Sequence, residues 1–348
     1  MLRPGQLGDL LLATPGLRAL RYGYPAAEIT LIAQPWAEGV AERFRWVDRV
    51  LPLRERPSDR GPDAGSALAG FLHDARAHHY DLALQLQGDD PTFARFALSL
   101  GARATAGYCA DPEIGQDFHL LLSMSPTEPE IFRTLRLVHA LGIPPVGAQP
   151  EFPPLPRDLE ELRGIPGLAD ILRRRPLIAI HPGARAPARR WTLDRFLELA
   201  TLLQERQGAS LLIVGGAEEV DLGRELCNRT GERSLNLAGR LSLGGLAALL
   251  RQVELFVGND SGPAQLAAAV APRSLRIFGP ANRYRWAPLD QNKHRMVYRQ
   301  VECSPCNHFE CPIDHRCLER ITVEDVMSEI EALLASEPSP AGQVRPTP

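Results

Sequence analysis

A chain of 348 residues is long enough for about two domains of ordinary size. With 44% apolar and 23% charged residues, it has the composition of a globular protein that can bury sizeable cores. The formal net charge of −3 argues against nucleic acid as a partner, and no stretch approaches the ~18 apolar residues of a membrane span. Because no N-terminal apolar run suggests a signal peptide, we expect a cytoplasmic protein.

The first half of the chain alternates stretches typical of strands with stretches typical of helices. A glycine-punctuated loop at residues 4–9 precedes residues 10–22, in which apolar side chains recur at helical spacing. Short strands separated by helices predict a parallel sheet covered on both faces. The other elements expected here are strands at 29–33, 82–86 and within 101–108, and an amphipathic helix at 130–141. Arg133 and Arg136 lie on one face of that helix, which predicts a solvated face or contact with an anionic acceptor.

The segment from Gly142 to Pro176 contains eight prolines, Pro176 included. Because proline interrupts helices and central strands, this segment is predicted to connect two domains, with one short helix at 157–163. We therefore place an N-terminal domain at 1–155 and a C-terminal domain at 156–335. The remaining segment, 336–348, is rich in proline and serine and is predicted to be a disordered tail.

The second half repeats the strand and helix alternation. Strands are predicted at 177–180, 211–214, 255–257 and 273–278, and helices at 193–207, 243–251 and 322–334. Thr322 and Glu324 are expected to cap the last of these helices. Two successive units of this kind predict an α/β protein made of two Rossmann-like, doubly wound parallel-sheet domains that face a cleft.

Ligands of open parallel sheets bind at the carboxyl ends of the strands. Asn259-Asp260-Ser261-Gly262-Pro263 follows one predicted strand and opens the apolar run 264–270. Asp260 or Ser261 can cap that helix, and Pro263 suits its first turn because no donor is needed there. The remaining amides and the helix dipole would then favour a diphosphate. A capped helix that serves packing alone is the competing interpretation.

A second loop, His181-Pro182-Gly183-Ala184-Arg185, is followed closely by Arg189 and Arg190. Guanidinium groups grip phosphate through two hydrogen bonds, so three of them in a short span suggest an anion site. Lys293 is the only lysine, however, so arginine is abundant for reasons unrelated to function, and a solvated loop fits as well. No dinucleotide fingerprint or P-loop motif occurs, which argues against nicotinamide dehydrogenases and P-loop phosphotransferases.

Asp9 lies between the first glycine loop and the first helix. A carboxylate there can take a proton from an incoming hydroxyl, although an N-terminal helix cap explains the residue equally well.

Four of the six cysteines lie within 15 residues: Cys303, Cys306, Cys311 and Cys317. One C-x-x-C pair with two further thiols is compatible with a tetrahedral structural zinc or iron site, and His308 or His315 can replace a thiol. Reduced free thiols and a disulfide are the alternatives.

Together these stretches resemble glycosyltransferase family 9, the family of the ADP-heptose:lipopolysaccharide heptosyltransferases. The resemblance extends from about residue 2 to residue 334. It is carried by residues 7–15 and 80–88, His181-Pro182-Gly183-Ala184, Arg189-Arg190-Trp191, Val214-Gly215-Gly216-Ala217-Glu218, Gly258-Asn259-Asp260-Ser261-Gly262, Phe278-Gly279-Pro280 and the cysteine cluster.

The resemblance implies a GT-B fold that transfers a heptose from ADP-heptose to a lipid-anchored, lipopolysaccharide-type glycan at the inner face of the inner membrane. The implied transfer inverts the anomeric carbon and uses no catalytic metal or other cofactor. Asp9 would be the general base, and Arg189 takes the place of a family lysine that contacts the donor phosphates. The other donor-binding residues are Gly183, Ala184, Arg185, Arg190, Glu218 (nucleoside), Asp260 (sugar or loop order), Ser261 and Gly262 (diphosphate), and Gln265.

The chain departs from the family pattern at two places. Gln265 replaces a histidine common in relatives, which removes any proton-linked role at that position. Relatives also have several apolar residues before the position of Arg3, so either the start lies upstream or the first strand is a stub. A same-fold transferase with another nucleotide sugar, for a surface polysaccharide or a protein, and a non-catalytic nucleotide-binding relative therefore stay open as alternatives.

Overall fold

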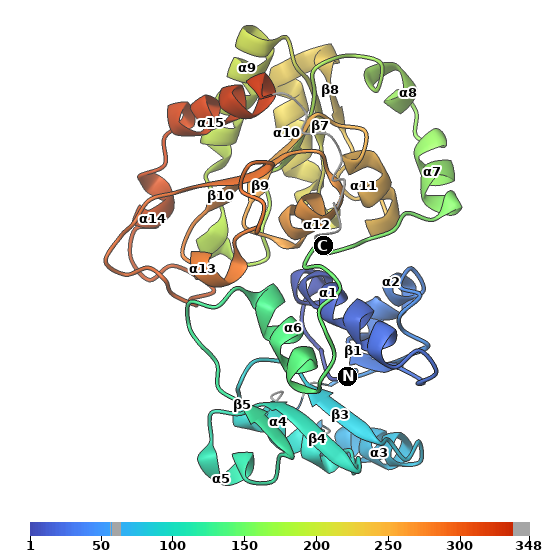
Figure 1. Ribbon diagram of the computed structural model, residues 1–348. Coiled ribbons are helices and arrows are strands. Elements are labelled where there is room, and N and C mark those ends of the chain that lie inside the picture. Colours follow the sequence, from blue (N-terminus) through green and yellow to red (C-terminus); the bar gives the residue numbers. More distant parts are fainter. Residues whose placement is uncertain (56, 58–63, 337–348) are drawn as a thin grey trace, which may run out of the picture. The chain divides into compact units, whose positions relative to one another are not determined.

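The computed structural model describes residues 1–55, 57 and 64–336. The chain divides into two compact units. Unit 1 comprises Met1–Pro153 together with Tyr284–Trp286, and unit 2 comprises Pro154–Arg283 and the chain from Ala287 onward. Both units are α/β structures built on parallel sheets, as the sequence predicts (Figure 1).

The first residues of the chain lie at the centre of the sheet of unit 1. Leu2 forms parallel bridges to Ile32 on one side and to Gln85 on the other. The residues 1–3 thereby join two groups of strands into one parallel layer, and the loop that follows them emerges at its carboxyl edge. The groups are β1 (Thr30–Ala33) with β2 (Arg49–Pro52), and β3 (Leu82–Gln85) with β4 (Ala104–Tyr108) and β5 (Leu120–Leu122).

Helix α1 (Leu7–Gly23) packs closely against α6 (Glu130–Ala140). Gly16 permits this approach, because a Cβ there would collide with the side chain of Thr134. The prediction of a solvated arginine face on α6 is wrong for Arg133, which is buried and pairs with Glu130 at 3.2 Å. The remaining helices of unit 1 are η1 (Pro35–Ala37), α2 (Glu38–Ala41), α3 (Ala64–Arg76), α4 (Pro91–Ser99) and α5 (Pro112–Gly115).

Unit 2 contains a six-stranded parallel sheet in the order β11-β10-β9-β6-β7-β8. Its central strands are fully buried, as expected for a sheet covered on both faces. The strands are β6 (Leu177–His181), β7 (Ser210–Ile213), β8 (Ser234–Asn236), β9 (Leu255–Asn259), β10 (Ser274–Phe278) and β11 (His294–Tyr298).

Helices cover both faces of the sheet of unit 2 (Figure 1). Alternate strand residues such as Ile178 and Val257 form one core with Phe196 of α9 and Ile330 of α15. Helices α11 and α12 cover the opposite face, to which the intervening strand residues point. The helices are α7 (Pro156–Arg163), α8 (Leu168–Ile171), η2 (Pro187–Arg189), α9 (Leu193–Gln207), η3 (Ala217–Glu219), α10 (Val220–Thr230), η4 (Gly231–Arg233), α11 (Leu243–Leu250), α12 (Gly262–Val270), α13 (Arg283–Trp286), α14 (Arg316–Glu319) and α15 (Val323–Ala335).

Most of the predicted helices and strands are present, and the structure contains several further elements that were not predicted. The proline-rich segment is not only a connector, because α7 packs against α11 and α8 follows it within unit 2. Thr322 caps α15 as predicted, but its partner is Asp325 rather than Glu324. Of the predicted tail, 336–348, only Ser336 lies within the described residues. The elements without a sequence prediction include β2, β5, β8, β11, α3, α4 and α10.

No helix in the described part of the chain combines the length and the apolar character that crossing a membrane requires.

Candidate functional site

Asp9 lies in the first turn of α1, directly after the glycine loop. Its Oδ2 accepts a hydrogen bond from the backbone N–H of Gln6 at 2.7 Å; Gln6 is the cap residue of α1, so Asp9 takes part in the cap as the third helical residue rather than as the cap itself. Its Oδ1 lies 3.3 Å from Nη2 of Arg3. Gly5 is needed here, because a Cβ at that position would lie 2.5 Å from the Asp9 carboxylate. The Asp9 side chain is 16% exposed, which leaves the carboxylate accessible to a proton donor.

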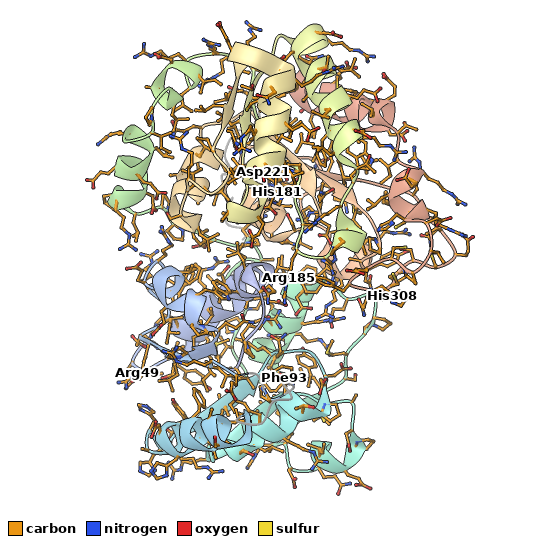
Figure 2. All side chains as sticks on the ribbon, turned by 180° about the vertical axis from the view of Figure 1, so that it is seen from behind. Arg49, Phe93, His181, Arg185, Asp221 and His308 are labelled. Atoms are coloured by element: carbon orange, nitrogen blue, oxygen red, sulfur yellow. The ribbon has the colours of Figure 1, made fainter. Side chains whose placement is uncertain are left out.

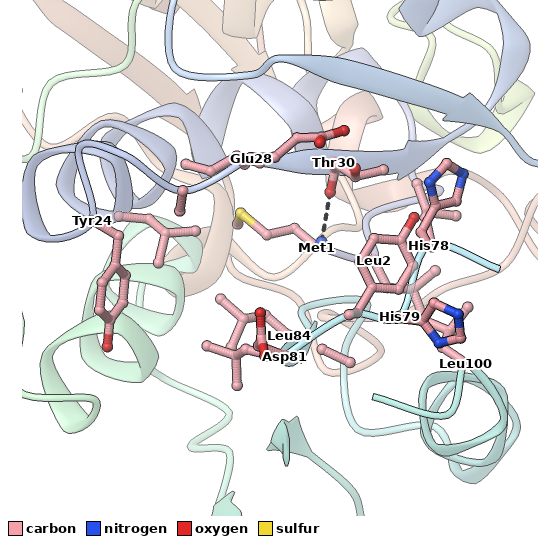
Figure 3. A pocket seen from close by; sticks show the side chains of 17 residues that line it. Met1, Leu2, Tyr24, Glu28, Thr30, His78, His79, Asp81, Leu84 and Leu100 are labelled. Carbon is pink, nitrogen blue, oxygen red and sulfur yellow. Dashed lines mark hydrogen bonds between the residues drawn. The ribbon is translucent and has the colours of Figure 1, made fainter. Parts of the chain in front are cut away.

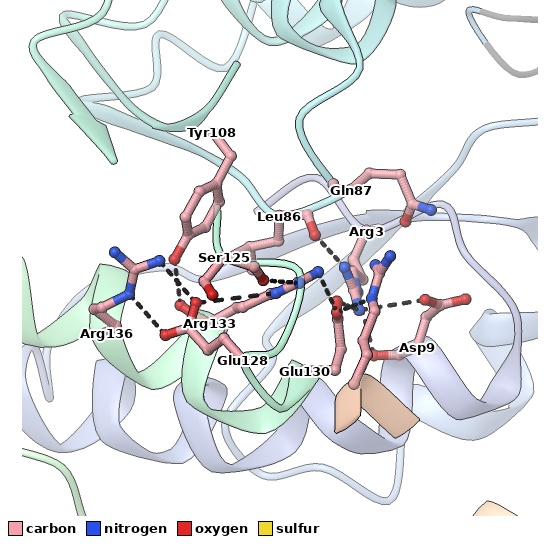
Figure 4. Close-up of polar contacts among 12 residues, drawn as sticks. Arg3, Asp9, Leu86, Gln87, Tyr108, Ser125, Glu128, Glu130, Arg133 and Arg136 are labelled. Atoms are coloured by element: carbon pink, nitrogen blue, oxygen red, sulfur yellow. Dashed lines mark hydrogen bonds and ion pairs between the residues drawn. The ribbon is translucent and has the colours of Figure 1, made fainter. Parts of the chain in front are cut away.

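Arg3 connects Asp9 to a buried ionic network in unit 1 (Figure 4). The Arg3 side chain donates to the carbonyl oxygen of Leu86 and, at 2.5 Å, to Oε1 of Glu130. Glu130 also pairs with Arg133, and with Arg285 at 2.6 Å. Burial alone would raise the pKa of Glu130, but the charges and hydrogen bonds of Arg3 and Arg285 outweigh it and lower that pKa to about 2. The side chain of Arg3 thereby ties Asp9, after the loop, to Leu86 and Glu130 in the interior of unit 1.

In unit 2, Asn259 joins three loops at the carboxyl edge of the sheet. Its buried Nδ2 donates to the carbonyl oxygens of Pro182 and Gly183, at 2.8 and 3.2 Å. Its Oδ1 accepts the backbone N–H of Trp191 at 3.0 Å. The loops after β6 and β9 and the turn η2 are therefore held together by one amide side chain, which uses its donor and acceptor atoms as a buried polar group must.

Asp260 lies between two arginines. Its Oδ1 is 3.3 Å from Nη1 of Arg276, and its Oδ2 is 3.3 Å from Nη1 of Arg189. Asp260 and Arg276 are buried, whereas the Arg189 side chain is 35% exposed. Sequence reasoning missed Arg276, because an arginine within an apolar strand belongs to no recognisable motif.

Ser261 occupies the cap position of α12, but its side chain accepts no bond from the first turn of that helix. The prediction that Asp260 or Ser261 caps the helix with a side chain is therefore wrong. The hydroxyl of Ser261 lies 3.2 Å from Nδ1 of His181 instead. Burial lowers the pKa of His181 to about 4, so this ring is neutral at pH 7 and carries no charge into the site. The N-terminus of α12 thus keeps its dipole and amides for an anion.

Glu219, rather than Glu218, is integrated into the loop after β7. Its Oε2 accepts the N–H of Gly216 at 2.6 Å. A Cβ at Gly183 would collide with its carboxylate, and one at Gly215 would lie 2.8 Å from its Cβ. Glu218 is exposed. Glu219 supplies only the carboxylate half of a capping box, because Gly216 has no side chain to return the bond, so the sequence carries no capping-box signature here.

The other predicted donor-binding residues lie around this edge of unit 2. Arg185 (Figure 2) and Arg190 are exposed, and Arg190 donates to the carbonyl oxygen of Ala184 at 2.7 Å. Gly183, Ala184 and Gln265 are buried, and Gly262 begins α12.

The loop that carries the four clustered cysteines contacts the turn η2 and the segment that follows β10. The N–H of Ala188 donates to the carbonyl oxygen of Phe309 at 3.1 Å, and the N–H of Cys306 to that of Pro280 at 2.7 Å. The loop therefore braces the turn that carries Arg189.

The four thiols of that loop influence one another. Burial and the charges of Cys303, Cys306 and Cys311 raise the pKa of Cys317 to about 11. The N–H of His315 donates to Sγ of Cys311 at 3.3 Å, whereas His308 is exposed (Figure 2). Within the described ranges, no group of three or more His, Cys, Asp or Glu side chains is arranged to hold a metal ion.

A pocket of about 550 Å³ lies elsewhere in unit 1 (Figure 3). Met1, Thr30, His78 and Asp81 are among its lining residues, which places it at the amino ends of β1 and β3. Ligands of parallel sheets bind at the opposite, carboxyl ends, where the Asp9 loop lies. The pocket is therefore separate from the candidate site.

Comparison with known proteins identifies the class. Residues 70–316 match the model of glycosyltransferase family 9 (heptosyltransferase), and the chain belongs to that family. Among curated relatives, lipooligosaccharide heptosyltransferase 2 of Campylobacter jejuni is 29% identical over 47% of this chain and 53% of its own length. The match therefore spans about half of that relative. Lipopolysaccharide heptosyltransferase 2 of Escherichia coli K12 is 25% identical over 96% of this chain and 97% of its own length.

Solved structures show the same fold. The ADP-heptose lipopolysaccharide heptosyltransferase II of E. coli matches with a TM-score of 0.72 and 22% identity, covering 96% of this chain and 97% of that one. The iron-containing dodecameric glycosyltransferase TibC of enterotoxigenic E. coli matches with a TM-score of 0.58 and 14% identity, covering 96% and 77%. The predicted GT-B class of α/β fold is confirmed.

Proposed function

We propose that this chain transfers a heptose from ADP-heptose to a lipopolysaccharide-type glycan. Membership of glycosyltransferase family 9 supports the reaction class, and the names of its relatives support the sugar and the nucleotide. The observation that carries the proposal is the arrangement at the carboxyl edge of unit 2. There Arg189, Ser261 and the N-terminus of α12 adjoin one another, which suits a nucleoside diphosphate.

In the proposed reaction, Asp9 takes the proton of the acceptor hydroxyl. The hydroxyl oxygen forms a bond to the anomeric carbon as the bond from that carbon to the diphosphate oxygen breaks, and the configuration inverts. The electron pair leaves with ADP. Arg189, Arg190, the hydroxyl of Ser261 and the amide of Gly262 stabilise the charge that develops on the diphosphate, so no catalytic metal is required.

The remaining residues bind the donor. Glu218 contacts the nucleoside, and Asp260 orders the loop or contacts the sugar. Gly183, Ala184 and Arg185 border the diphosphate, and Gln265 supports it without titrating near neutral pH. The acceptor is anchored by lipid, so the enzyme acts in the cytoplasm with peripheral contact at the inner membrane.

Replacement of Asp9 by Asn tests the assignment of the base. Asn still caps α1 but cannot accept the proton, so kcat should fall by about 10²- to 10⁴-fold while ADP affinity stays unchanged. Asp90→Asn is the matched control, because Asp90 also caps a helix, through a bond from the N–H of Thr92. Equal kcat in the Asp9→Asn variant and the wild type would remove Asp9 from the mechanism.

A same-fold transferase with a different donor is the second candidate. Gln265 and Arg189 favour it, because both differ from the residues usual in the family at those positions. Slow hydrolysis of ADP-heptose and of UDP-, GDP- and dTDP-sugars by the purified protein separates the two. Turnover of another donor without turnover of ADP-heptose would overturn the heptose proposal. ADP binding without turnover of any donor would identify a non-catalytic relative.

We also propose that Cys303, Cys306, Cys311 and Cys317 hold one structural zinc or iron ion. The four cysteines lie within one segment of 15 residues, so a bound ion could draw their thiolates together into one tetrahedral set. TibC, whose fold is similar, is an iron-containing glycosyltransferase, which agrees with such a site. Such an ion would stabilise the loop that braces Arg189 and would take no part in the transfer.

Metal analysis of protein purified without chelator should find about one ion per chain, because four thiolates complete a tetrahedral site. Cys306→Ser should lose the ion and lower the thermal unfolding midpoint. Cys227→Ser, at a cysteine outside the loop, should retain the ion and the unfolding midpoint of the wild type. A fully folded wild-type protein without metal would refute the site.

A further inference from the structure

Arg276 is an unexpected residue in the centre of unit 2. It lies within β10, and its side chain is only 2% exposed. The covered face of a parallel sheet is normally apolar, and a buried guanidinium is costly unless a carboxylate and other acceptors satisfy it. Here Nη1 faces Oδ1 of Asp260 at 3.3 Å, and Nη2 donates to the carbonyl oxygen of Ala264 in α12 at 3.3 Å.

The position next to Arg276 in the sheet carries no side chain. Arg276 is in register with Gly258 on β9, and Gly258 with His181 on β6, so the three positions share one row and one face. A Cβ at Gly258 would lie 2.9 Å from the carbonyl oxygen of His181 and 3.0 Å from Cζ of Phe256. Contacts with His181 and Phe256 therefore require glycine at the middle position of this row, next to Arg276.

Arg189, Asp260 and Arg276 form a charged cluster, and its net charge determines how strongly it attracts a diphosphate. Asp260 alone would cancel the charge of Arg189, its exposed partner, and a nucleoside diphosphate would meet a neutral pair. With Arg276 included, two guanidinium groups share one carboxylate, and the cluster keeps one net positive charge. Each arginine is paired with a different oxygen of Asp260.

We infer that Arg276 is a positioning residue for diphosphate binding. It holds Asp260 through Oδ1 and offsets its charge, so that Arg189 can turn from Oδ2 toward the phosphates of the donor. This inference rests on the proposed donor site in unit 2. It assigns Arg276 no direct contact with the donor.

The test measures binding of ADP and of adenosine by calorimetry to the wild type and four variants. Arg276→Met should weaken ADP binding by about 10- to 100-fold and leave adenosine unchanged, because only the phosphates sense the lost charge. Arg276→Lys and the double variant Arg276→Met/Asp260→Asn restore the net charge and should bind ADP within a few-fold of the wild type. Asp260→Asn should bind ADP at least as tightly as the wild type.

Equal ADP affinity of Arg276→Met and the wild type would overturn the inference, as would a parallel loss of ADP and adenosine binding. If Arg276→Met does not fold, Asp260→Asn and the double variant, which differ only at Arg276, supply the comparison. ADP should bind about 10-fold more tightly to Asp260→Asn than to the double variant, and equal ADP affinity of these two variants would overturn the inference. A wild type that binds no ADP would instead refute the proposed donor site itself.

Discussion

Single residues at the candidate site combine a structural and a proposed chemical use. Asp9 caps α1 through Gln6 and pairs with Arg3, yet stays partly exposed. Ser261 stands at the cap position of α12 but directs its hydroxyl toward His181. A cap that uses one carboxylate oxygen leaves lone pairs for a proton, so capping and base catalysis are compatible in Asp9. The two interpretations that the sequence left open for this residue need not exclude each other.

Gly258 permits a prediction for a single position. Gly258→Ala should lower the free energy of unfolding by about 1–3 kcal/mol, because the added Cβ meets the backbone of β6, which cannot move without disturbing the sheet. Urea unfolding measures this. Gly70→Ala is the control: no atom lies within 4 Å of a Cβ there, and alanine favours the helix α3 by about 0.5–1 kcal/mol. Equal stability of Gly258→Ala and the wild type would contradict the close approach.

At the scale of elements, helices differ in how the free backbone amides of their first turn are hydrogen-bonded. Thr322 and Asp325 form a reciprocal capping box at α15, with bonds of 3.1 and 2.9 Å. Thr192 occupies the same position at α9, but its side chain makes no capping bond. Residue type at a cap position therefore does not by itself establish that a cap bond forms.

Thr322→Ala should destabilise the protein by about 1 kcal/mol, since it removes an acceptor for a first-turn amide. Thr192→Ala should change stability by less than about 0.5 kcal/mol, because no such bond is lost. Midpoints of urea unfolding for the two variants give the comparison. A larger effect at Thr192 than at Thr322 would show that the cap geometry is wrong.

At the scale of the whole molecule, stability depends on ionisable groups that are buried in both units. Burial lowers the pKa of His181 and of His294 to about 4, below the ordinary value of 6.5. Burial opposes ionisation of Glu130, but its arginine partners lower its pKa to about 2. In each case the folded state takes up its proton at a lower pH than the unfolded state. All three groups therefore favour unfolding as the pH falls.

The stability of the protein should decline in two stages on acidification. Between pH 6.5 and 4 the unfolded chain protonates His181 and His294, and between pH 4.5 and 2 it protonates Glu130. Each group contributes about 3 kcal/mol at most. The free energy of unfolding, measured in urea from about pH 7 downward, should show this slope, and His181→Gln should reduce it in the upper range only. A stability that is constant between about pH 7 and 5 would contradict the burial of the two histidines.

Much of the architecture could be predicted from the amino-acid sequence. Apolar periodicity and glycine or proline punctuation predicted α9 at its observed bounds and most central strands within one or two residues, because buried parallel strands must be apolar and helices must present one apolar face. Elements with weaker patterns, such as α3, α10 and β11, were missed. The ordered motifs also carried the resemblance to glycosyltransferase family 9, and the match to that family over residues 70–316 confirms it.

The meeting of particular polar side chains, in contrast, became visible only in the folded chain. The pairing of Arg276 with Asp260 depends on strand register, and the network around Glu130 gathers arginines from positions 3, 133 and 285. The burial of Arg133 depends on neighbours that helical spacing cannot reveal. Local sequence patterns report which face of an element is apolar, whereas the partner of a charged group is set by contacts between residues far apart in the chain.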